Sequence, residues 1–179
     1  DIELDPITGD IFISLTGNSY NNNFYGSILK ITEKENDYYS KNFISEVFLT
    51  GGEETGFACP DNLIFDYKGN LWFTSDISGS YMKKEPYLKF KNNGLFVVKR
   101  SGNNLGKIIQ IASAPNDAEF TGPYFSPDNK TLFLSVQHPG QYSTEFDFTS
   151  NWPSGIQGEK PRSAVISVSG ELLNNIDKL

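Results

Sequence analysis

Acidic side chains recur in this sequence at intervals of about sixty residues. Glu3 lies near the beginning, Asp61 follows Cys-Pro, and Glu119 stands before Phe-Thr-Gly-Pro. Carboxylates that cluster raise one another's pKa or require a cation, and their hard oxygens suit calcium, magnesium, manganese or ferric iron rather than a thiolate metal. A shared metal site is therefore one interpretation. The other is that each acid caps a strand or hydrogen-bonds a turn.

The composition excludes several other chemistries within this chain. The single cysteine, Cys59, has no partner for an internal disulfide, and the single histidine, His138, cannot build a histidine-rich zinc site. With 15 Lys and Arg against 22 Asp and Glu, the net charge of −7 would repel a nucleic-acid backbone, and no basic patch offsets it. The longest apolar runs are far below the roughly 20 residues that span a bilayer.

The acids belong to a block that occurs three times, beginning at residues 1, 61 and 121. In each block a half-apolar run leads through a loop rich in Asp, Gly, Asn and Pro into a β-branched or aromatic run, a pattern typical of a β-hairpin. Each block then predicts a third strand, and the first two predict a fourth. The third strands are expected at 27–31, 94–98 and 164–168, and the fourth strands at 44–49 and 107–111.

Four antiparallel strands per repeat are typical of a β-propeller blade. The sequence therefore predicts an all-β fold with three antiparallel blades, at about 1–58, 59–118 and 119–179, the last of them incomplete. A β-sandwich is the alternative, although its strands need not form matching groups. Helical periodicity is weak everywhere, and residues 171–179 are too short a segment to count.

Three blades cannot close a ring, because propellers typically need about four to eight. We therefore expect this chain to be half of a larger ring, paired with a missing amino-terminal half or with a second copy of itself. The first residue is Asp rather than Met, which suggests a piece cut from a longer polypeptide.

Several segments, in a fixed order, carry a family resemblance. They are CPDNLIFD at 59–66, GNLWFTSD at 69–76, EFTGP at 119–123 and TLFLSVQHPG at 131–140, together with DIE at 1–3, NNFYG at 22–26 and PRSAV at 161–165. This ordered set resembles the PhoX-type alkaline phosphatases over nearly the whole chain. A PDxLxFD and GxLWxT pair also occurs in calcium-dependent lactonase propellers, so the full set, with its Gln-His-Pro-Gly block, makes the resemblance specific.

The resemblance implies a six-bladed propeller that hydrolyses phosphate monoesters. It implies iron and calcium ions held at the channel mouth by carboxylates and one thiolate, and a secreted or periplasmic protein. Asp61 falls on the family's PD motif and Glu119 on its ExTGP motif, so both are expected to be cation ligands, with Glu3 and Asp76 as second candidates. Cys59 stands where the family has a small residue, and we expect a buried cysteine there rather than the metal thiolate.

Two residues are weaker candidates for a catalytic role. His138 is expected either to hydrogen-bond phosphate or a ligand carboxylate, or simply to tie down the turn before Pro139. Arg162 is expected either to pair with a carboxylate or phosphate, or to form an ion pair on the surface.

The leading hypothesis is the carboxyl-terminal half of a metal-dependent phosphatase, inactive alone because the family's thiolate and further glutamates would lie upstream. The alternatives are a calcium-dependent lactonase or esterase-like propeller and a non-catalytic binding propeller whose acids only cap strands. Residues 83–93 are predicted to be solvated surface. Residues 141–160 are predicted to form a long loop that covers the channel mouth or buries its aromatic rings against a neighbouring blade.

Overall fold

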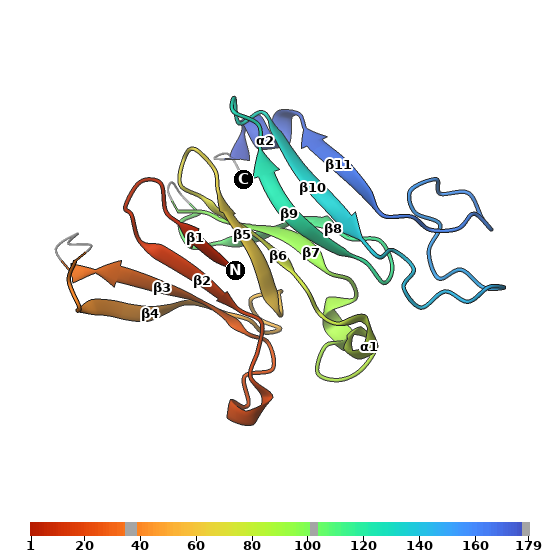
Figure 1. Ribbon diagram of the computed structural model, residues 1–179, viewed down its shortest axis with the longest axis horizontal. Helices are drawn as coiled ribbons and strands as arrows, with labels where there is room; N and C mark the ends of the chain where they lie inside the picture. Colours follow the sequence, from red (N-terminus) through yellow and green to blue (C-terminus); the bar gives the residue numbers. More distant parts are fainter. Residues whose placement is uncertain (35–38, 101–103, 177–179) are drawn as a thin grey trace.

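The computed structural model describes residues 1–34, 39–100 and 104–176, and this part of the chain folds into three antiparallel β-sheets (Figure 1). The first two sheets have four strands each and the third has three. In chain order, the first sheet contains β1 (Ile2–Leu4), β2 (Ile11–Leu15), β3 (Ser27–Glu33) and β4 (Phe43–Thr50); the second contains β5 (Pro60–Phe65), β6 (Leu71–Ser75), β7 (Gly94–Val98) and β8 (Ile108–Ser113); the third contains β9 (Glu119–Phe125), β10 (Thr131–Gln137) and β11 (Ala164–Ser169).

This strand grouping confirms the prediction from the repeat. Every strand pairs with its neighbour in the chain, so each sheet is a meander of the kind found in propeller blades. Short helical turns connect or follow the strands. These are η1 (Ser19–Asn21), α1 (Gly79–Met82), η3 (Leu88–Phe90) and α2 (Glu171–Asn174). The one-turn helix α2 was not predicted; it forms where Leu173 and Ile176 join the core beside the third sheet.

The sheets pack against each other through aromatic and aliphatic layers. Between the first and second sheets, Phe12 meets Phe65 edge to face, with ring centroids 5.2 Å apart. Between the second and third, Trp72 meets Phe125 in the same way at 5.5 Å. Fully burying such a side chain stabilises the fold by about 1.5–3 kcal/mol, so these two layers fix how neighbouring sheets lie.

The two outermost sheet faces carry exposed apolar side chains. On the first sheet Ile2 and Leu4 are exposed, and on the third sheet Tyr124, Phe133 and Val165 are exposed. Alternate residues of β10 point inward instead, because side chains on a strand alternate between its faces. Figure 1 shows the three sheets following one another across the molecule.

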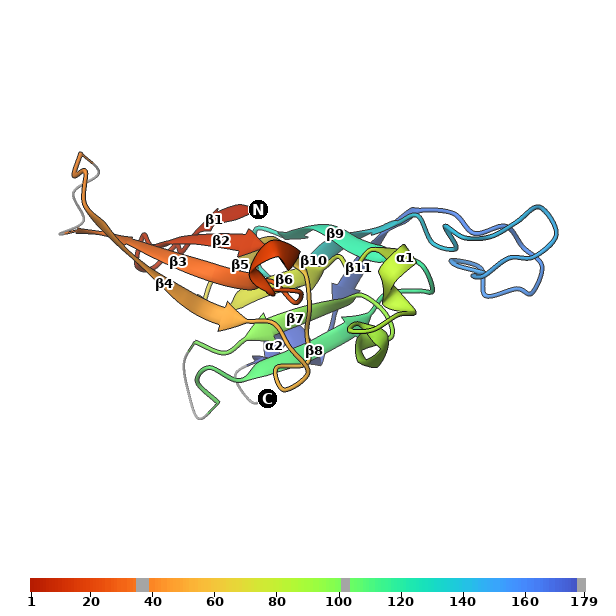
Figure 2. The same cartoon turned by 90° about the horizontal axis from the view of Figure 1, so that it is seen from below.

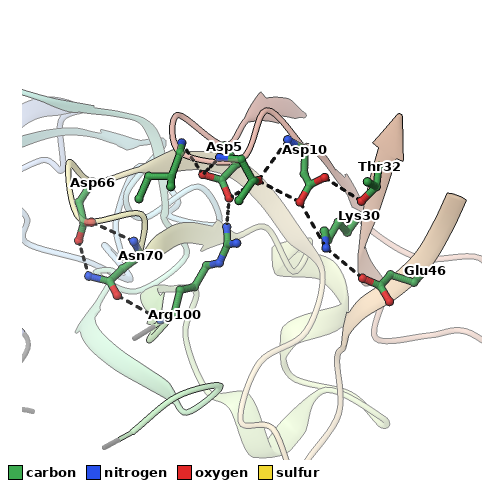
Figure 3. A network of polar contacts seen from close by, with 10 residues as sticks. Asp5, Asp10, Lys30, Thr32, Glu46, Asp66, Asn70 and Arg100 are labelled. Atoms are coloured by element: carbon green, nitrogen blue, oxygen red, sulfur yellow. Dashed lines mark hydrogen bonds and ion pairs between the residues drawn. The ribbon is translucent and has the colours of Figure 1, made fainter. Parts of the chain in front are cut away.

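A polar network joins the hairpin turns of the first and second sheets (Figure 3). Asp5 accepts hydrogen bonds from Ile7 N and Thr8 Oγ1 in its own turn, and it pairs with Arg100 from the second sheet. Asp66 accepts from Asn70 N and Nδ2 and from Trp72 Nε1, each at 2.9–3.0 Å. The network extends through Asp10 to Thr32, Lys30 and Glu46.

The segment between β10 and β11 forms a long loop that extends away from the sheets in both views (Figures 1 and 2). Its Trp152 packs against the core that joins the second and third sheets, whereas Phe146 is 92% exposed. The expectation of buried rings is therefore met for Trp152 and not for Phe146. Among the described residues, no helix has the length and apolar character needed to cross a membrane.

Candidate functional site

Strand ends of the second and third sheets bring three acidic side chains together. Asp61 is the second residue of β5, and Asp76 directly follows β6. Because these strands are antiparallel and Pro60 pairs with Ser75, the two acids lie at the same end of the hairpin. Glu119 is the first residue of β9, and β9 packs against β5 and β6.

Glu119 is the most buried of the three acids, with 7% of its surface exposed. Burial and the neighbouring carboxyl groups of Asp76 and Asp61 together raise the pKa of Glu119 to about 8. Its Oε2 atom is buried without a hydrogen-bond partner. A buried acceptor that lacks a partner is costly, and it is the kind of atom that a cation would satisfy.

The same environment acts on Asp61. Burial, followed by the charge of Asp76, raises the pKa of Asp61 above its usual range. Three carboxyl groups thus lie close together in a partly dehydrated environment. Ionising all of them needs a positive charge nearby, and their oxygens are the ligands that calcium and ferric iron accept.

The described residues do not complete a metal site by themselves. Within residues 1–34, 39–100 and 104–176, no group of three or more His, Cys, Asp or Glu side chains has an arrangement able to hold a metal ion. The chemistry of the donors fits a hard cation, but further ligands would have to come from elsewhere.

His138 contacts this cluster directly. Its Nε2 lies 3.4 Å from Glu119 Oε1, and its Nδ1 lies 3.0 Å from the carbonyl oxygen of Asp117. The ring therefore bridges the backbone just before β9 and the carboxylate at its start. His138 has a φ of 42°, in the left-handed region, so the turn holds its backbone in an uncommon conformation.

The other predicted residues have different relations to this group. Glu3 is partly buried on β1, and burial raises its pKa, but the charges that shift Asp61 and Glu119 do not include it. Arg162 is exposed, and its side chain forms no ion pair with the described residues. Cys59 lies next to the group: its carbonyl oxygen accepts a hydrogen bond from Asp76 N at 2.8 Å. Its side chain is buried, as expected, and burial raises the pKa of the thiol to about 11.

A buried asparagine that sequence reasoning missed holds the acidic strand ends together. Asn93 accepts a hydrogen bond from Ile77 N at 2.7 Å and donates to the carbonyls of Ile77 and Ala118 at 3.2 Å. These residues directly follow Asp76 and directly precede Glu119. Asn93 is 2% exposed, so the prediction that 83–93 is solvated surface is wrong at this residue; its place before the central strand β7 was the available signal.

A second missed residue, Asn62, links the second and third sheets. Its Oδ1 accepts hydrogen bonds from Thr121 Oγ1 at 2.7 Å and from Gly122 N at 2.8 Å. The Pro-Asp-Asn segment is thereby tied to the Thr-Gly segment that follows Glu119. The two motifs singled out in the sequence are neighbours in space.

Asp117 anchors two connecting segments just below the cluster. It is 5% exposed, lies 3.4 Å from Lys83 Nζ, and accepts a hydrogen bond from Thr149 Oγ1. Lys83 follows α1, and Thr149 belongs to the long loop between β10 and β11. Both segments are therefore attached two residues before Glu119.

Comparisons with known proteins agree with this architecture. The family model described as alkaline phosphatase PhoX matches residues 1–140. The solved structure "Pseudomonas fluorescens PhoX in complex with vanadate, a transition state analogue" is similar with a TM-score of 0.77 and 25% sequence identity, over 94% of this chain and 33% of that one. The chain thus spans about a third of the length of that relative. No curated protein matches the sequence.

Proposed function

The chain belongs to the PhoX family of alkaline phosphatases, and on that premise we propose that it forms the carboxyl-terminal part of a metal-dependent phosphomonoesterase. The parent protein is a six-bladed β-propeller to which this chain contributes three blades, at about 1–58, 59–118 and 119–179. Iron and calcium ions are its cofactors, and it acts in the periplasm or outside the cell, as the family resemblance implies.

One observation carries the proposal: Glu119 is buried with an oxygen that has no partner, beside Asp76 and Asp61. With a pKa of about 8, Glu119 is largely neutral at pH 7 without a cation; a bound cation would let it ionise and would use the oxygen that has no partner. We propose that Asp61, Asp76 and Glu119 hold cations, with Glu3 as a further ligand. Bound metal ions would supply the positive charge that clamps phosphoryl oxygens during hydrolysis.

The neighbouring residues position these carboxylates. His138 contacts Glu119 Oε1 and is itself held by the Asp117 carbonyl. Asn93 fixes the backbone that follows Asp76 to the backbone that precedes Glu119. Mutation of groups that orient metal ligands commonly lowers metal affinity or activity by about 10–100-fold. We therefore include both residues in the proposed functional site.

The uncovered sheet faces support the view that further blades complete the ring. Ile2 on the first sheet and Tyr124 on the third are 63% and 69% exposed, although neighbouring sheets in this chain bury comparable side chains. We propose that blades from an amino-terminal half cover both faces and supply the remaining metal ligands. The isolated chain is then expected to be inactive.

The test compares the isolated chain with the complete polypeptide that contains it, both supplied with ferric and calcium salts. We expect the complete protein to hydrolyse an aryl phosphate and the isolated chain to show negligible turnover. Elemental analysis of the complete protein should find iron and calcium, and both should fall in the Glu119→Gln variant. Hydrolysis of a lactone without phosphatase activity would instead select the lactonase alternative. A metal-free protein whose melting is insensitive to chelators would select a non-catalytic propeller.

A further inference from the structure

A cavity of about 520 Å³ opens directly beside the carboxylate cluster. One wall comes from the segment between β2 and β3, including Ser19 and Phe24, and the other from the segment that follows β6, including Tyr81 and Tyr87. Asp76 belongs both to the lining of the cavity and to the carboxylate cluster. The cavity therefore borders the proposed phosphate site at Asp76.

The chemistry of the lining restricts what the cavity can hold. Phe24 and Tyr81 are 40% and 57% exposed, so both rings have surface that a ligand can reach. No Lys, Arg or His is among the lining residues, and the ionisable carboxylates there are Asp76 and Glu85. Lys84 Nζ lies over the Tyr81 ring, 5.8 Å from its centre, but Lys84 is not part of the wall. An additional anionic group would meet repulsion here, whereas a flat uncharged group would pack on the rings.

The cavity is held open by contacts within the chain. Tyr87 Oη donates a hydrogen bond to the Phe24 carbonyl at 2.7 Å, which ties the two walls together. Tyr87 also packs edge to face on Tyr25, with ring centroids 6.1 Å apart. A preformed pocket with apolar walls and a few polar groups is typical of small-molecule sites.

We propose that this cavity binds the alcohol portion of the phosphate monoester and selects aromatic, uncharged leaving groups. This inference rests on the proposed function, because it requires the phosphate itself to lie at the carboxylates. A second cavity, of about 490 Å³, lies under the long loop among Pro139, Phe148 and Lys160, and none of the three acids lines it. The position of Asp76 therefore favours the first cavity.

The test uses the complete protein with two substrates, phenyl phosphate and methyl phosphate. The methyl group is too small to reach the rings, so its turnover reports the phosphate site alone. We expect Tyr81→Ala to lower kcat/KM for phenyl phosphate about tenfold and to leave methyl phosphate nearly unchanged. The matched control is Tyr67→Ala, since Tyr67 is similarly exposed, at 64%, but lies in the β5–β6 turn at the other end of the sheet. The ratio of the two substrates should not change in this control.

A second variant keeps the test informative if Tyr81→Ala is poorly folded. Ser19 is exposed at the rim, and Ser19→Trp should fill the cavity and reduce phenyl phosphate turnover selectively. Equal loss on both substrates in both variants, or no change in either, would overturn the proposed leaving-group pocket while leaving the phosphatase function standing. If the unmodified protein hydrolyses neither substrate, the phosphatase function itself fails.

Discussion

Two groups of acids lie at opposite ends of the packed sheets and differ in their surroundings. At the hairpin turns, Asp5 and Asp10 are buried but each accepts several hydrogen bonds and meets a cation (Figure 3). At the other end, Asp61, Asp76 and Glu119 have one another as neighbours, and a Glu119 oxygen has no partner.

The pKa shifts express the same contrast. For Asp5, burial alone would raise the pKa, but hydrogen bonds from Ile7 and Thr8 and the Arg100 guanidinium outweigh burial and lower it. For Glu119, burial and the neighbouring carboxylates act in the same direction and raise the pKa to about 8. In this fold, carboxyl groups at one end are stabilised by hydrogen bonds and cations. At the other end the cost of burying them is not offset, which is common at functional sites.

The largest effect on stability is expected at the turn end. Asp5→Ala would leave the Arg100 guanidinium, which is 20% exposed, without its carboxylate and would remove the acceptor for the turn. Breaking a buried pair in this way costs about 3–5 kcal/mol. Chemical unfolding of the complete protein should show this loss. The control Asp128→Ala removes an exposed turn aspartate of the third sheet and should cost much less; equal losses would erase the contrast between a paired and a solvated aspartate.

The next largest effect is on activity, and it should distinguish the acids at the site most clearly from those at the turn. Glu119→Gln replaces a carboxyl group whose ionisation the fold disfavours with a neutral amide of similar size, so we expect the metal-free protein to keep or increase its melting temperature. Phosphatase kcat should fall by about a hundredfold or more, because an amide replaces a proposed cation ligand. Calorimetry of the chelated protein and an aryl phosphate assay measure the two quantities. A strong loss of stability with activity preserved would place Glu119 among the structural acids.

Asn93 is expected to affect both properties, because it lies in the functional half but is fully hydrogen-bonded. Asn93→Ala would leave Ile77 N and the Ala118 carbonyl buried without their partner, at a cost of about 1–3 kcal/mol. It should also lower activity, since Asp76 and Glu119 lose their common anchor. The neighbouring Asn92→Ala is the matched control. Should the two variants behave alike in unfolding and in turnover, the anchoring role would be wrong.

The sequence predicted the sheets better than it predicted the contacts between them. The period of two in segments such as Thr131–Gln137 and the Asp- and Gly-rich turns are local signals, and they gave the strand groups directly. The proximity of Asp61 and Glu119 also followed, because equivalent strand ends of stacked repeats meet. The pairing of Asp5 with Arg100 did not, since 95 residues separate them and no local pattern specifies the partner of a turn acid.

The same limit explains the error at Asn93. An Asn-Asn-Gly run after a lysine-rich segment has the composition of an exposed turn, and only the packing of β7 between its neighbours shows that the second asparagine is enclosed. Burial of a polar residue depends on what the rest of the chain places over it. Buried polar residues that hydrogen-bond to distant parts of the chain are therefore the part of such a site that sequence composition does not predict.

The smallest effect is the acid sensitivity of the turn network. Burial would raise the pKa of Asp10, but hydrogen bonds from Thr32 and Thr8 and the ammonium of Lys30 lower it below 3.8. The contribution of Asp10 to stability is therefore complete only well above its unfolded-state pKa, and it is lost as the pH falls from there through the lowered pKa of the folded state. Because Lys30 is partly exposed, we expect about 1 kcal/mol or less. Urea unfolding at pH 7, 4 and 2.5 should show a shallower acid loss in Asp10→Asn than in the unmodified protein. An unchanged acid loss would mean that the lowered pKa of Asp10 contributes nothing to stability, and that only Asp5 distinguishes the turn end from the site.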